Sequence, residues 1–378
     1  MFIKRIFSLL IFLSLFSVNS FSIQIRVLVV SKVKKAHLKI NSRFSVFSPD
    51  KKIKFLERRR LKNSYVLAHE WGISIAGYGF KSQSILIVPK KKNSIFLNKK
   101  QLRGNLLIFN KNKFLYFVNL IDLEEYLKGV VPKEMPFWWP LEALKAQAVV
   151  ARTYALYKIK NNKENFYDVC ISQLSQVYGF KKSEHIKTNI AVFLTKNEVL
   201  TYKGEIFPTY YHACCGGRTA NAKLFFKKDY LPLKGIKDPY CKGTKFYSWK
   251  KKIPKSYLIK MLLKKGYVLK DIKNIKITKR TESGRCWEIE IEKETGSVIK
   301  IWGPDLRKIL KGKILSDLYE IRLKGKYVYF EGRGWGHGVG LCQWGAFVMA
   351  KKGKDYKEIL SFYYPGSELK KINEDFRF

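Results

Sequence analysis

Short apolar runs separated by polar turns dominate the first third of the chain. The first run, residues 23–30, is rich in β-branched residues, which are typical of strands. Further strand-like runs lie between turns of lysine and asparagine, at residues 84–88, 94–97, 105–109 and 114–118. The pattern predicts a β-rich N-terminal region over residues 23–114.

After residue 120 the apolar spacing becomes that of helices. Residues 122–128 predict a short helix that ends at Gly129, because glycine is a common helix stop. Residues 140–157 form the clearest helical pattern, with Pro140 at the first helical position and five alanines in the interior. Apolar residues cover most sides of this helix, so we expect it to be buried. Its Arg152 then needs a partner, and a supporting role is favoured over a chemical one.

Strand and helix patterns alternate in the rest of the chain. We expect helices at residues 185–194, 304–310 and 346–352, and strands at 198–202, 206–212, 287–292, 319–323 and 327–330. The predicted class is α+β. A mixed α/β domain with a buried alanine-rich helix follows the β-rich region and spans residues 115–370, and residues 241–330 form an α+β part within it.

The N-terminus and the charge bear on where the protein works. Residues 1–22 resemble a secretory signal, with Lys4 and Arg5 before an apolar run at 6–18, and either cleavage or retention as an anchor is compatible with the sequence. We therefore expect an exported protein, in the periplasm or associated with the cell envelope. The net charge of +44 then favours an anionic envelope surface over nucleic acid, since the lysines are spread along the chain. A lysine-rich solvated surface is the alternative interpretation.

Glu134 is the strongest candidate for chemistry. It lies between Pro132 and Pro136, before the aromatic residues 137–139, so we expect it in a turn. An apolar wall raises the pKa of a carboxyl group, which suits a general acid, and aromatic rings can face a sugar. The alternative is an exposed loop glutamate beside a tryptophan cluster of the core.

Six cysteines allow several interpretations in an exported chain. Cys215 and Cys241 are the best candidates for a disulfide, because they flank a predicted strand–loop unit. A metal site would draw on His212, Cys214 and Cys215, with ligands added from His337, Cys170 and Cys342. Paired ligand spacing such as Cys-x-x-Cys is absent from the sequence, so we expect no metal. A nucleophilic cysteine is a weaker alternative.

Five glycines alternate over residues 332–340, around Trp335 and His337. The residues that would make this a nucleotide-binding loop are missing. The glycines let backbone pass close to a bulky group, with His337 and Gln343 expected at the surface. Two interpretations stay open: a saccharide groove flanked by Trp335 and Trp344, and a crowded core strand.

Several of these segments occur together, in order, in a known family. The segments are 126–136 (YLKGVVPKEMP), 139–149 (WPLEALKAQAV), 151–155 (ARTYA), 176–179 (QVYG), 211–212 (YH) with 216–219 (GGRT), 283–285 (SGR), 336–346 (GHGVGLCQWGA) and 363–366 (YYPG). In these segments the chain resembles the SpoIID/LytB family, named for the stage II sporulation protein D, over about residues 115–368. The resemblance implies a peptidoglycan lytic transglycosylase that acts on the MurNAc–GlcNAc β-1,4 bond, or a relative that enhances a wall amidase.

The resemblance also implies roles for individual residues. Glu134 matches the catalytic glutamate of the Glu-Met-Pro motif, and the expected partners are glycan strands stripped of stem peptides and a cell-wall amidase. Candidates for groove or support roles are Arg152, Tyr178, His212, His337 and Gln343. Some relatives carry zinc on cysteines of an Asp-x-Cys…Cys-Gln segment, but here Ser175 precedes Gln176 although Cys170 is kept. We therefore expect neither a metal nor another cofactor.

Overall fold

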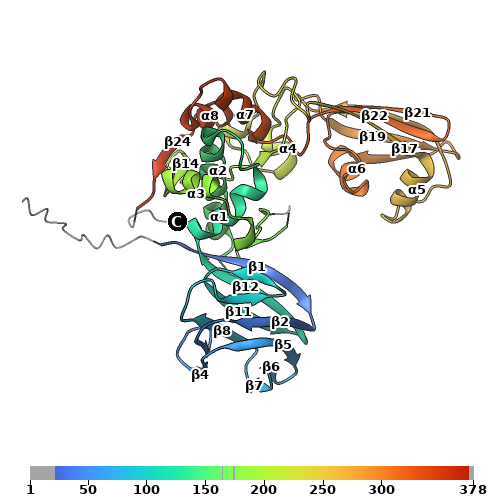
Figure 1. The fold of residues 1–378 in the computed structure, drawn as a ribbon. Coiled ribbons are helices and arrows are strands. Elements are labelled where there is room, and N and C mark those ends of the chain that lie inside the picture. The colour runs from blue at the N-terminus through green and yellow to red at the C-terminus, as the bar shows by residue number, and fades with distance from the viewer. Residues whose placement is uncertain (1–21, 164, 173–174, 374–378) are drawn as a thin grey trace, which may run out of the picture.

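A computed structural model describes residues 22–163, 165–172 and 175–373. The predicted signal sequence lies outside the described residues, apart from Ser22. Three parts follow one another along the chain: a β-rich part, a helical part and a lobe of strands and two helices that projects from the helical part (Figure 1). The mixed α+β class predicted from the sequence is confirmed. In the described ranges, none of the helices has the length and apolar character needed to cross a membrane.

Two sheets build the β-rich part. One has the strand order β13 (Val169–Cys170), β1 (Gln24–Val33), β12 (Phe114–Asp122), β11 (Asn105–Lys111), β8 (Ser84–Pro89), β3 (Phe44–Phe47) and β4 (Lys54–Arg58). The other has the order β10 (Lys100–Leu102), β9 (Ile95–Leu97), β2 (Lys35–Ile40), β5 (Leu61–His69), β6 (Gly72–Ile75) and β7 (Tyr78–Phe80). Alternate residues of β1 (Ile25, Val27 and Val29) are buried, as expected for a strand with one face on a core.

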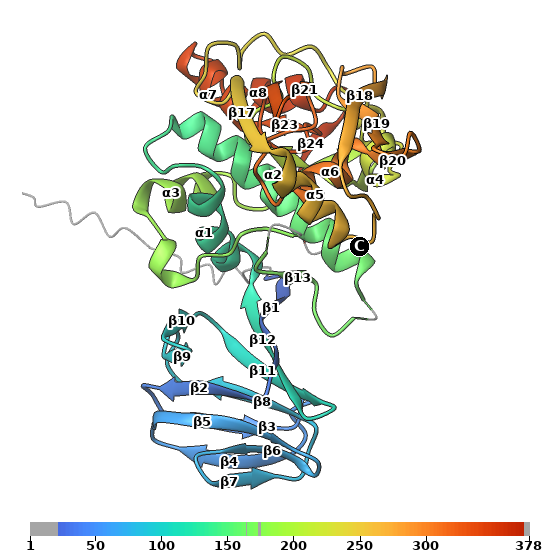
Figure 2. The ribbon, with the colours of Figure 1, turned by 90° about the vertical axis from the view of Figure 1, so that its right-hand side faces the viewer.

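The β-rich part leads directly into the helices. β1 and β12 pair antiparallel and rise towards α1 (Leu123–Glu134) (Figure 2). β12 continues to Asp122, whose carboxylate accepts a hydrogen bond from the Glu125 backbone N–H and caps α1. The strand that ends the β-rich part therefore fixes the start of the helix that ends at Glu134.

α2 (Leu141–Asn161) is the central helix, and its residues 146–157 are all buried, as its alanine-rich pattern predicts. It packs against α1, α3 (Ile186–Leu194), α7 (Gln343–Lys351), α8 (Tyr356–Tyr363) and β14 (Glu198–Tyr202). The helical part also contains η1 (Lys181–Ser183), β15 (Glu205–Ile206), β16 (Tyr211–His212), α4 (Ala222–Phe226), η2 (Leu231–Leu233), β23 (Leu341–Cys342) and β24 (Glu368–Lys371). β16 and β23 pair in parallel and bring two distant segments together.

The helix predicted to stop at Gly129 continues to Glu134, so two expectations from the sequence are wrong. Gly129 lies within α1 and does not stop the helix. A glycine is needed there because the Tyr178 ring packs against it, and a Cβ atom would lie 2.4 Å from that ring. Pro132 also lies inside the helix. Glu134 is the last residue of α1 rather than part of a turn, and the turn begins at Met135.

The projecting lobe has its own apolar core. It contains the sheet β17 (Ser248–Pro254), β22 (Tyr327–Arg333) and β21 (Tyr319–Lys324), and the sheet β18 (Ile272–Arg280), β19 (Cys286–Lys293) and β20 (Val298–Trp302). Its helices are α5 (Lys255–Leu263) and α6 (Gly303–Ile309). Arg285 and the glycine-rich segment after β22 connect the lobe to the helical part.

Candidate active site around Glu134

The Glu134 side chain is half-buried at the C-terminal end of α1. Its Oε1 accepts a hydrogen bond of 2.9 Å from the Val177 backbone N–H, and the Tyr211 hydroxyl donates a second. Burial raises the pKa of Glu134, and these two hydrogen bonds lower it by less. A carboxyl group with a raised pKa holds its proton closer to neutral pH, as a general acid requires.

A buried polar layer supports Glu134 from below. The Gln176 amide donates to the Tyr211 hydroxyl (3.3 Å) and to the Ala151 carbonyl of α2 (3.2 Å), and it accepts from the Tyr126 hydroxyl (3.4 Å). Burial, and to a smaller extent the negative charge of Glu134, raises the pKa of Tyr126 and of Tyr211 well above the usual value. Both hydroxyl groups therefore stay protonated. This layer fixes the direction from which Tyr211 donates to Glu134.

Three aromatic residues follow Glu134 closely in the chain. Phe137 and Trp138, in the turn after α1, expose 41% and 68% of their surface, whereas Trp139 is buried. Trp139 packs on Trp344 (ring centroids 4.9 Å apart), and the contacts continue through Phe246 to a second exposed indole. That indole belongs to Trp335, which is 42% exposed and whose ring centroid lies 4.5 Å from that of Phe246. Exposed rings of this size are typical of surfaces that bind a ligand.

Arg152 supports the fold and does not reach the carboxyl group of Glu134. Its fully buried guanidinium donates two hydrogen bonds of 2.7 Å to Glu124 and one each to the carbonyls of Glu198 (3.1 Å) and Val192 (3.2 Å). It thus joins α1, α2, α3 and β14. The supporting role that the sequence favoured agrees with these contacts.

Tyr178 also supports α1. Its buried ring packs on Tyr126 (ring centroids 5.1 Å apart) and on Phe180 (5.0 Å), against the backbone of Gly129. The neighbouring Val177 supplies the backbone N–H that Glu134 accepts. Tyr178 therefore anchors the segment that holds Glu134.

His212 and His337 lie beside one another, with ring centroids 5.6 Å apart. His212 is buried, and its Nδ1 donates to the Val339 carbonyl (3.1 Å), whereas Nδ1 of His337 accepts from the Val339 N–H (3.0 Å). Burial lowers the pKa of His212 to about 3 and the pKa of His337 well below its usual value. Both rings are neutral and hold the glycine-rich segment in place. His337 was expected at the surface and is half-buried.

Gln343 is buried rather than at the surface, because it starts α7 against α2. Its Nε2 donates to Oε1 of Gln147, 3.1 Å away. The crowded-strand interpretation of the glycines is supported here: a Cβ at Gly338, where φ is +82°, would lie 2.1 Å from the buried Arg285 guanidinium. The bulky groups that these glycines accommodate belong to the protein itself.

Cys215 and Cys241, the pair expected to form a disulfide, are free thiols with their sulfurs 3.4 Å apart. The Cys215 thiol donates to Asp238, at 3.0 Å. Cys214, Cys241 and Cys342 lie around the same point, so Cys215 has several sulfur neighbours rather than one.

Cys170 ends the short strand β13 and is half-buried. The Cys170 sulfur is 3.2 Å from the Ser172 hydroxyl. Within the described ranges, Cys170 belongs to no group of three or more potential metal ligands. A group of that kind occurs at Cys215, Asp238, Cys241 and Cys342.

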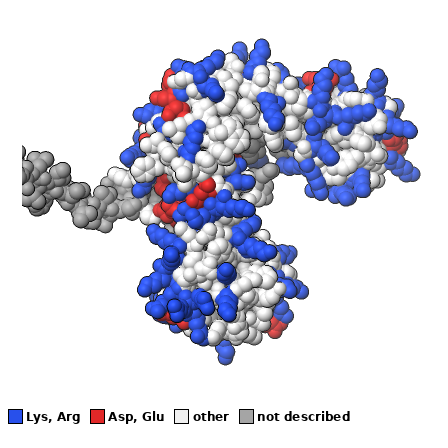
Figure 3. Space-filling view, in the orientation of Figure 1, with Lys and Arg blue, Asp and Glu red and all other residues white. Residues whose placement is uncertain are grey.

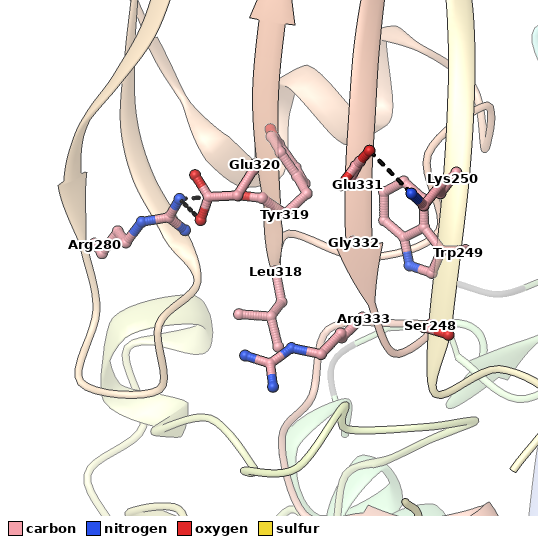
Figure 4. Close-up of a pocket in the computed structure, with 10 residues that line it drawn as sticks. All are labelled: Ser248, Trp249, Lys250, Arg280, Leu318, Tyr319, Glu320, Glu331, Gly332 and Arg333. Carbon is pink, nitrogen blue, oxygen red and sulfur yellow. Dashed lines mark hydrogen bonds and ion pairs between the residues drawn. The ribbon is translucent and has the colours of Figure 1, made fainter. Parts of the chain in front are cut away.

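A cleft of about 510 Å³ lies on the projecting lobe, is lined from β17, β18, β21 and β22, and does not include Glu134 (Figure 4). Four of its five charged groups form two pairs, Lys250 with Glu331 (3.2 Å) and Arg280 with Glu320 (2.7 Å), and the fifth is Arg333. Its Trp249 donates to the Gly334 carbonyl (2.8 Å). These contacts stabilise the join between the lobe and the glycine-rich segment, and they offer no counterpart to the Glu134 carboxyl group.

Lysine and arginine side chains are spread over all three parts of the molecule on the face shown in Figure 3. Acidic side chains are fewer on this face, and one group lies where the β-rich part meets the helices. A basic surface that covers the whole molecule attracts an extended polyanion more than it defines one binding site.

Sequence reasoning missed the residues that contact Glu134 and those that support them. Tyr126, Gln176 and Tyr211 were part of recognised segments, but nothing in their spacing showed that Tyr211 donates to Glu134 or that Gln176 joins the two tyrosines. The signal that was available is chemical: a glutamine and two tyrosines in separate apolar segments are polar groups that need buried partners. The Val177 N–H has no side-chain signal at all.

Two family models match parts of this chain. Residues 111–202, which contain Glu134, α2 and the Gln176 segment, match the family model "Stage II sporulation protein". Residues 220–340 match a model described as "Domain of unknown function (DUF8618)", which covers the projecting lobe.

Among curated proteins, the chain is 33% identical to an uncharacterized protein of Brachyspira hyodysenteriae, over 82% of this chain and 84% of that protein. It is 30% identical to the amidase enhancer of Bacillus subtilis, over 64% of this chain but only 40% of that longer relative. It is 32% identical to the stage II sporulation protein D of Bacillus subtilis, over 67% of this chain and 75% of that protein. The chain therefore belongs to the stage II sporulation protein D family.

Proposed function

We propose that the protein is an exported peptidoglycan lytic transglycosylase that uses Glu134 as its general acid and base. The observation that carries the proposal is the raised pKa of this half-buried carboxyl group, which Val177 and Tyr211 hold and which exposed aromatic residues follow in the chain. Family membership supports an action on the cell wall. The substrate would be a glycan strand, cut at the MurNAc–GlcNAc β-1,4 bond.

One carboxyl group is sufficient for this reaction. Glu134 donates its proton to the glycosidic oxygen, and the bond from that oxygen to C1 of the muramyl sugar breaks. The C6 hydroxyl of the same sugar attacks C1, and its proton passes to the Glu134 carboxylate. The product is a 1,6-anhydromuramyl end, and the carboxyl group regains its proton without water. Hydrolytic glycosidases use a second carboxylate instead.

The surroundings of Glu134 provide the other functions that this chemistry needs. Tyr211 and the Val177 N–H stabilise the carboxylate after it has given up its proton. Phe137 and Trp138 offer apolar faces for sugar rings. The basic surface would draw the protein to an anionic envelope, which is consistent with the export expected from the N-terminal sequence.

Mass spectrometry tests the proposal. Protein without residues 1–22 is incubated with intact peptidoglycan and with glycan strands freed of stem peptides, and the soluble products are analysed. The proposal expects 1,6-anhydromuramyl ends from the unmodified protein and their loss in Glu134→Gln. Equal product from both proteins, or none from either, would refute it.

A second function is favoured by one comparison, the match to a relative named amidase enhancer. In this alternative the protein binds the wall and increases the rate of a cell-wall amidase without cutting glycan itself. Enhancement would then be unchanged in Glu134→Gln, and binding to peptidoglycan would weaken with added salt because the surface is basic. Adding an N-acetylmuramoyl-L-alanine amidase to the same assay separates the two functions.

A further inference from the structure

Three cysteine sulfurs and one carboxylate meet beneath the glycine-rich segment. Cys215 follows β16, Cys241 lies in the loop after η2, and Cys342 ends β23. These residues and Asp238 are all buried, and their four potential ligand atoms lie within 4.8 Å of one another. Zinc bonds to sulfur of about 2.3 Å in a tetrahedron place neighbouring sulfurs about 3.8 Å apart. The separation of 3.4 Å between Cys215 and Cys241 is close to that value.

Hydrogen bonds from outside the group orient the potential ligands. The Asp238 carboxylate accepts from the Tyr240 N–H (2.8 Å) on one oxygen and from the Tyr363 hydroxyl (3.0 Å) on the other. The Cys215 N–H points at the Cys342 sulfur (3.2 Å), and a backbone N–H also reaches the Cys215 sulfur, from Gly217 at 3.4 Å. Such partners hold the ligands of known metal sites and stabilise thiolates.

The surroundings also offset negative charge. The fully buried Arg285 guanidinium donates to the Cys215 carbonyl at 2.8 Å, so a cation lies beside the sulfurs. Three buried cysteine sulfurs next to the Asp238 carboxylate provide the ligands that a divalent cation such as Zn²⁺ needs.

We propose that Cys215, Cys241, Cys342 and Asp238 bind one Zn²⁺ ion in a closed, structural site. Each thiol loses its proton to solvent when it binds, and Asp238 exchanges the Cys215 hydrogen bond for the metal. This site is separate from the segment around Cys170. The proposal does not rest on the proposed glycan chemistry, since its ligands do not include Glu134 or the residues that contact it.

The site would tie together segments that position the active site. His212 and Cys342 are register partners in the pairing of β16 with β23, and Tyr211, the partner of Glu134, precedes His212. Zinc held by Cys342 on one strand and by Cys215 just after the other would fix this pairing. Loss of zinc would therefore lower thermal stability as well as loosen Tyr211.

The test uses protein without residues 1–22, purified under reducing conditions, dialysed with Zn²⁺ and then freed of unbound metal. Elemental analysis is expected to find one Zn²⁺ per chain, and removal of the metal by a chelator should lower the unfolding temperature. Co²⁺ in place of Zn²⁺ should give the intense sulfur-to-metal absorption and the visible bands of a tetrahedral thiolate site. These spectra report ligands without depending on activity.

Matched variants assign the ligands. Cys342→Ser and Cys241→Ser should each lower Zn²⁺ affinity by at least tenfold, and Asp238→Asn should change the Co²⁺ spectrum. Cys170→Ser, Cys214→Ser and Cys286→Ser should each keep one Zn²⁺. The proposal would be overturned if the folded, unmodified protein bound no Zn²⁺. It would also be overturned if peptide mapping found a Cys215–Cys241 disulfide in protein prepared without reductant and in the presence of Zn²⁺. Retention of Zn²⁺ in a folded Cys342→Ser protein would also overturn it.

Discussion

The buried ion pair between Arg152 and Glu124 allows a quantitative test of the fold that carries Glu134. Glu124→Gln removes the negative charge and one of the two strong acceptors, both 2.7 Å from the guanidinium. Arg152 is fully buried and keeps only the Glu198 and Val192 carbonyls and one amide oxygen. Removing one partner of a buried ion pair lowers the free energy of unfolding by about 3–5 kcal/mol. Because Arg152 can still donate a hydrogen bond to the amide oxygen of the new side chain, we expect a loss of about 3 kcal/mol.

Urea denaturation followed by tryptophan fluorescence measures this loss as a shift of the unfolding midpoint. The double variant Glu124→Leu/Arg152→Met should lose less stability than Glu124→Gln, since it leaves no buried charge without a partner. Asp229→Asn breaks the exposed pair with Lys223 and should leave the midpoint unchanged. A loss below about 1 kcal/mol in Glu124→Gln would refute the assignment of Arg152 as the group that joins α1 to α2.

Three further predictions concern the site and its support. Burial raises the pKa of Glu134, and transglycosylase activity should be lost as pH rises through that pKa because the protonated acid is lost. Tyr211→Phe removes a hydrogen bond that lowers the pKa of Glu134, so the alkaline limb of the pH–rate profile should move to higher pH. Trp138→Ala should raise KM for glycan by roughly 3- to 10-fold without changing the unfolding temperature, whereas Trp71→Ala, an exposed indole of the β-rich part, should change neither. Burial lowers the pKa of His212 in the folded protein from its usual 6.5 to about 3. The stability that neutral His212 contributes is therefore present above pH 6.5 and is lost as pH falls towards 3. In His212→Gln the urea midpoint should fall less over that pH range.

Periodic patterns in the sequence predicted most of the regular structure. Alternation of β-branched residues identified β1 (Gln24–Val33), and the alanine-rich run identified α2 (Leu141–Asn161) and its burial. These patterns work because a strand or helix with one apolar face is defined by residues close in sequence. The end of α1 was missed because Gly129 serves a tertiary contact with Tyr178, and no local rule contains that information.

The site was predictable only in part, for the same reason. Glu134 and its aromatic neighbours are adjacent in sequence, so their combination could be recognised as a candidate acid. Val177 and Tyr211 reach Glu134 from separate segments, and Cys215, Cys241 and Cys342 meet without any paired spacing. The histidines were candidates for groove or support roles, and in the fold both are neutral and occupied with backbone groups.

The most direct test of the central claim is the yield of 1,6-anhydromuramyl ends from glycan strands treated with unmodified protein and with Glu134→Gln, matched for unfolding temperature. Loss of the general acid should reduce the rate by at least about 100-fold, since general acid catalysis contributes roughly 10²–10⁴-fold. Glu134→Asp keeps a carboxyl group at a shorter reach and should retain a small fraction of the rate. Anhydro products formed at the same rate by Glu134→Gln would contradict the account.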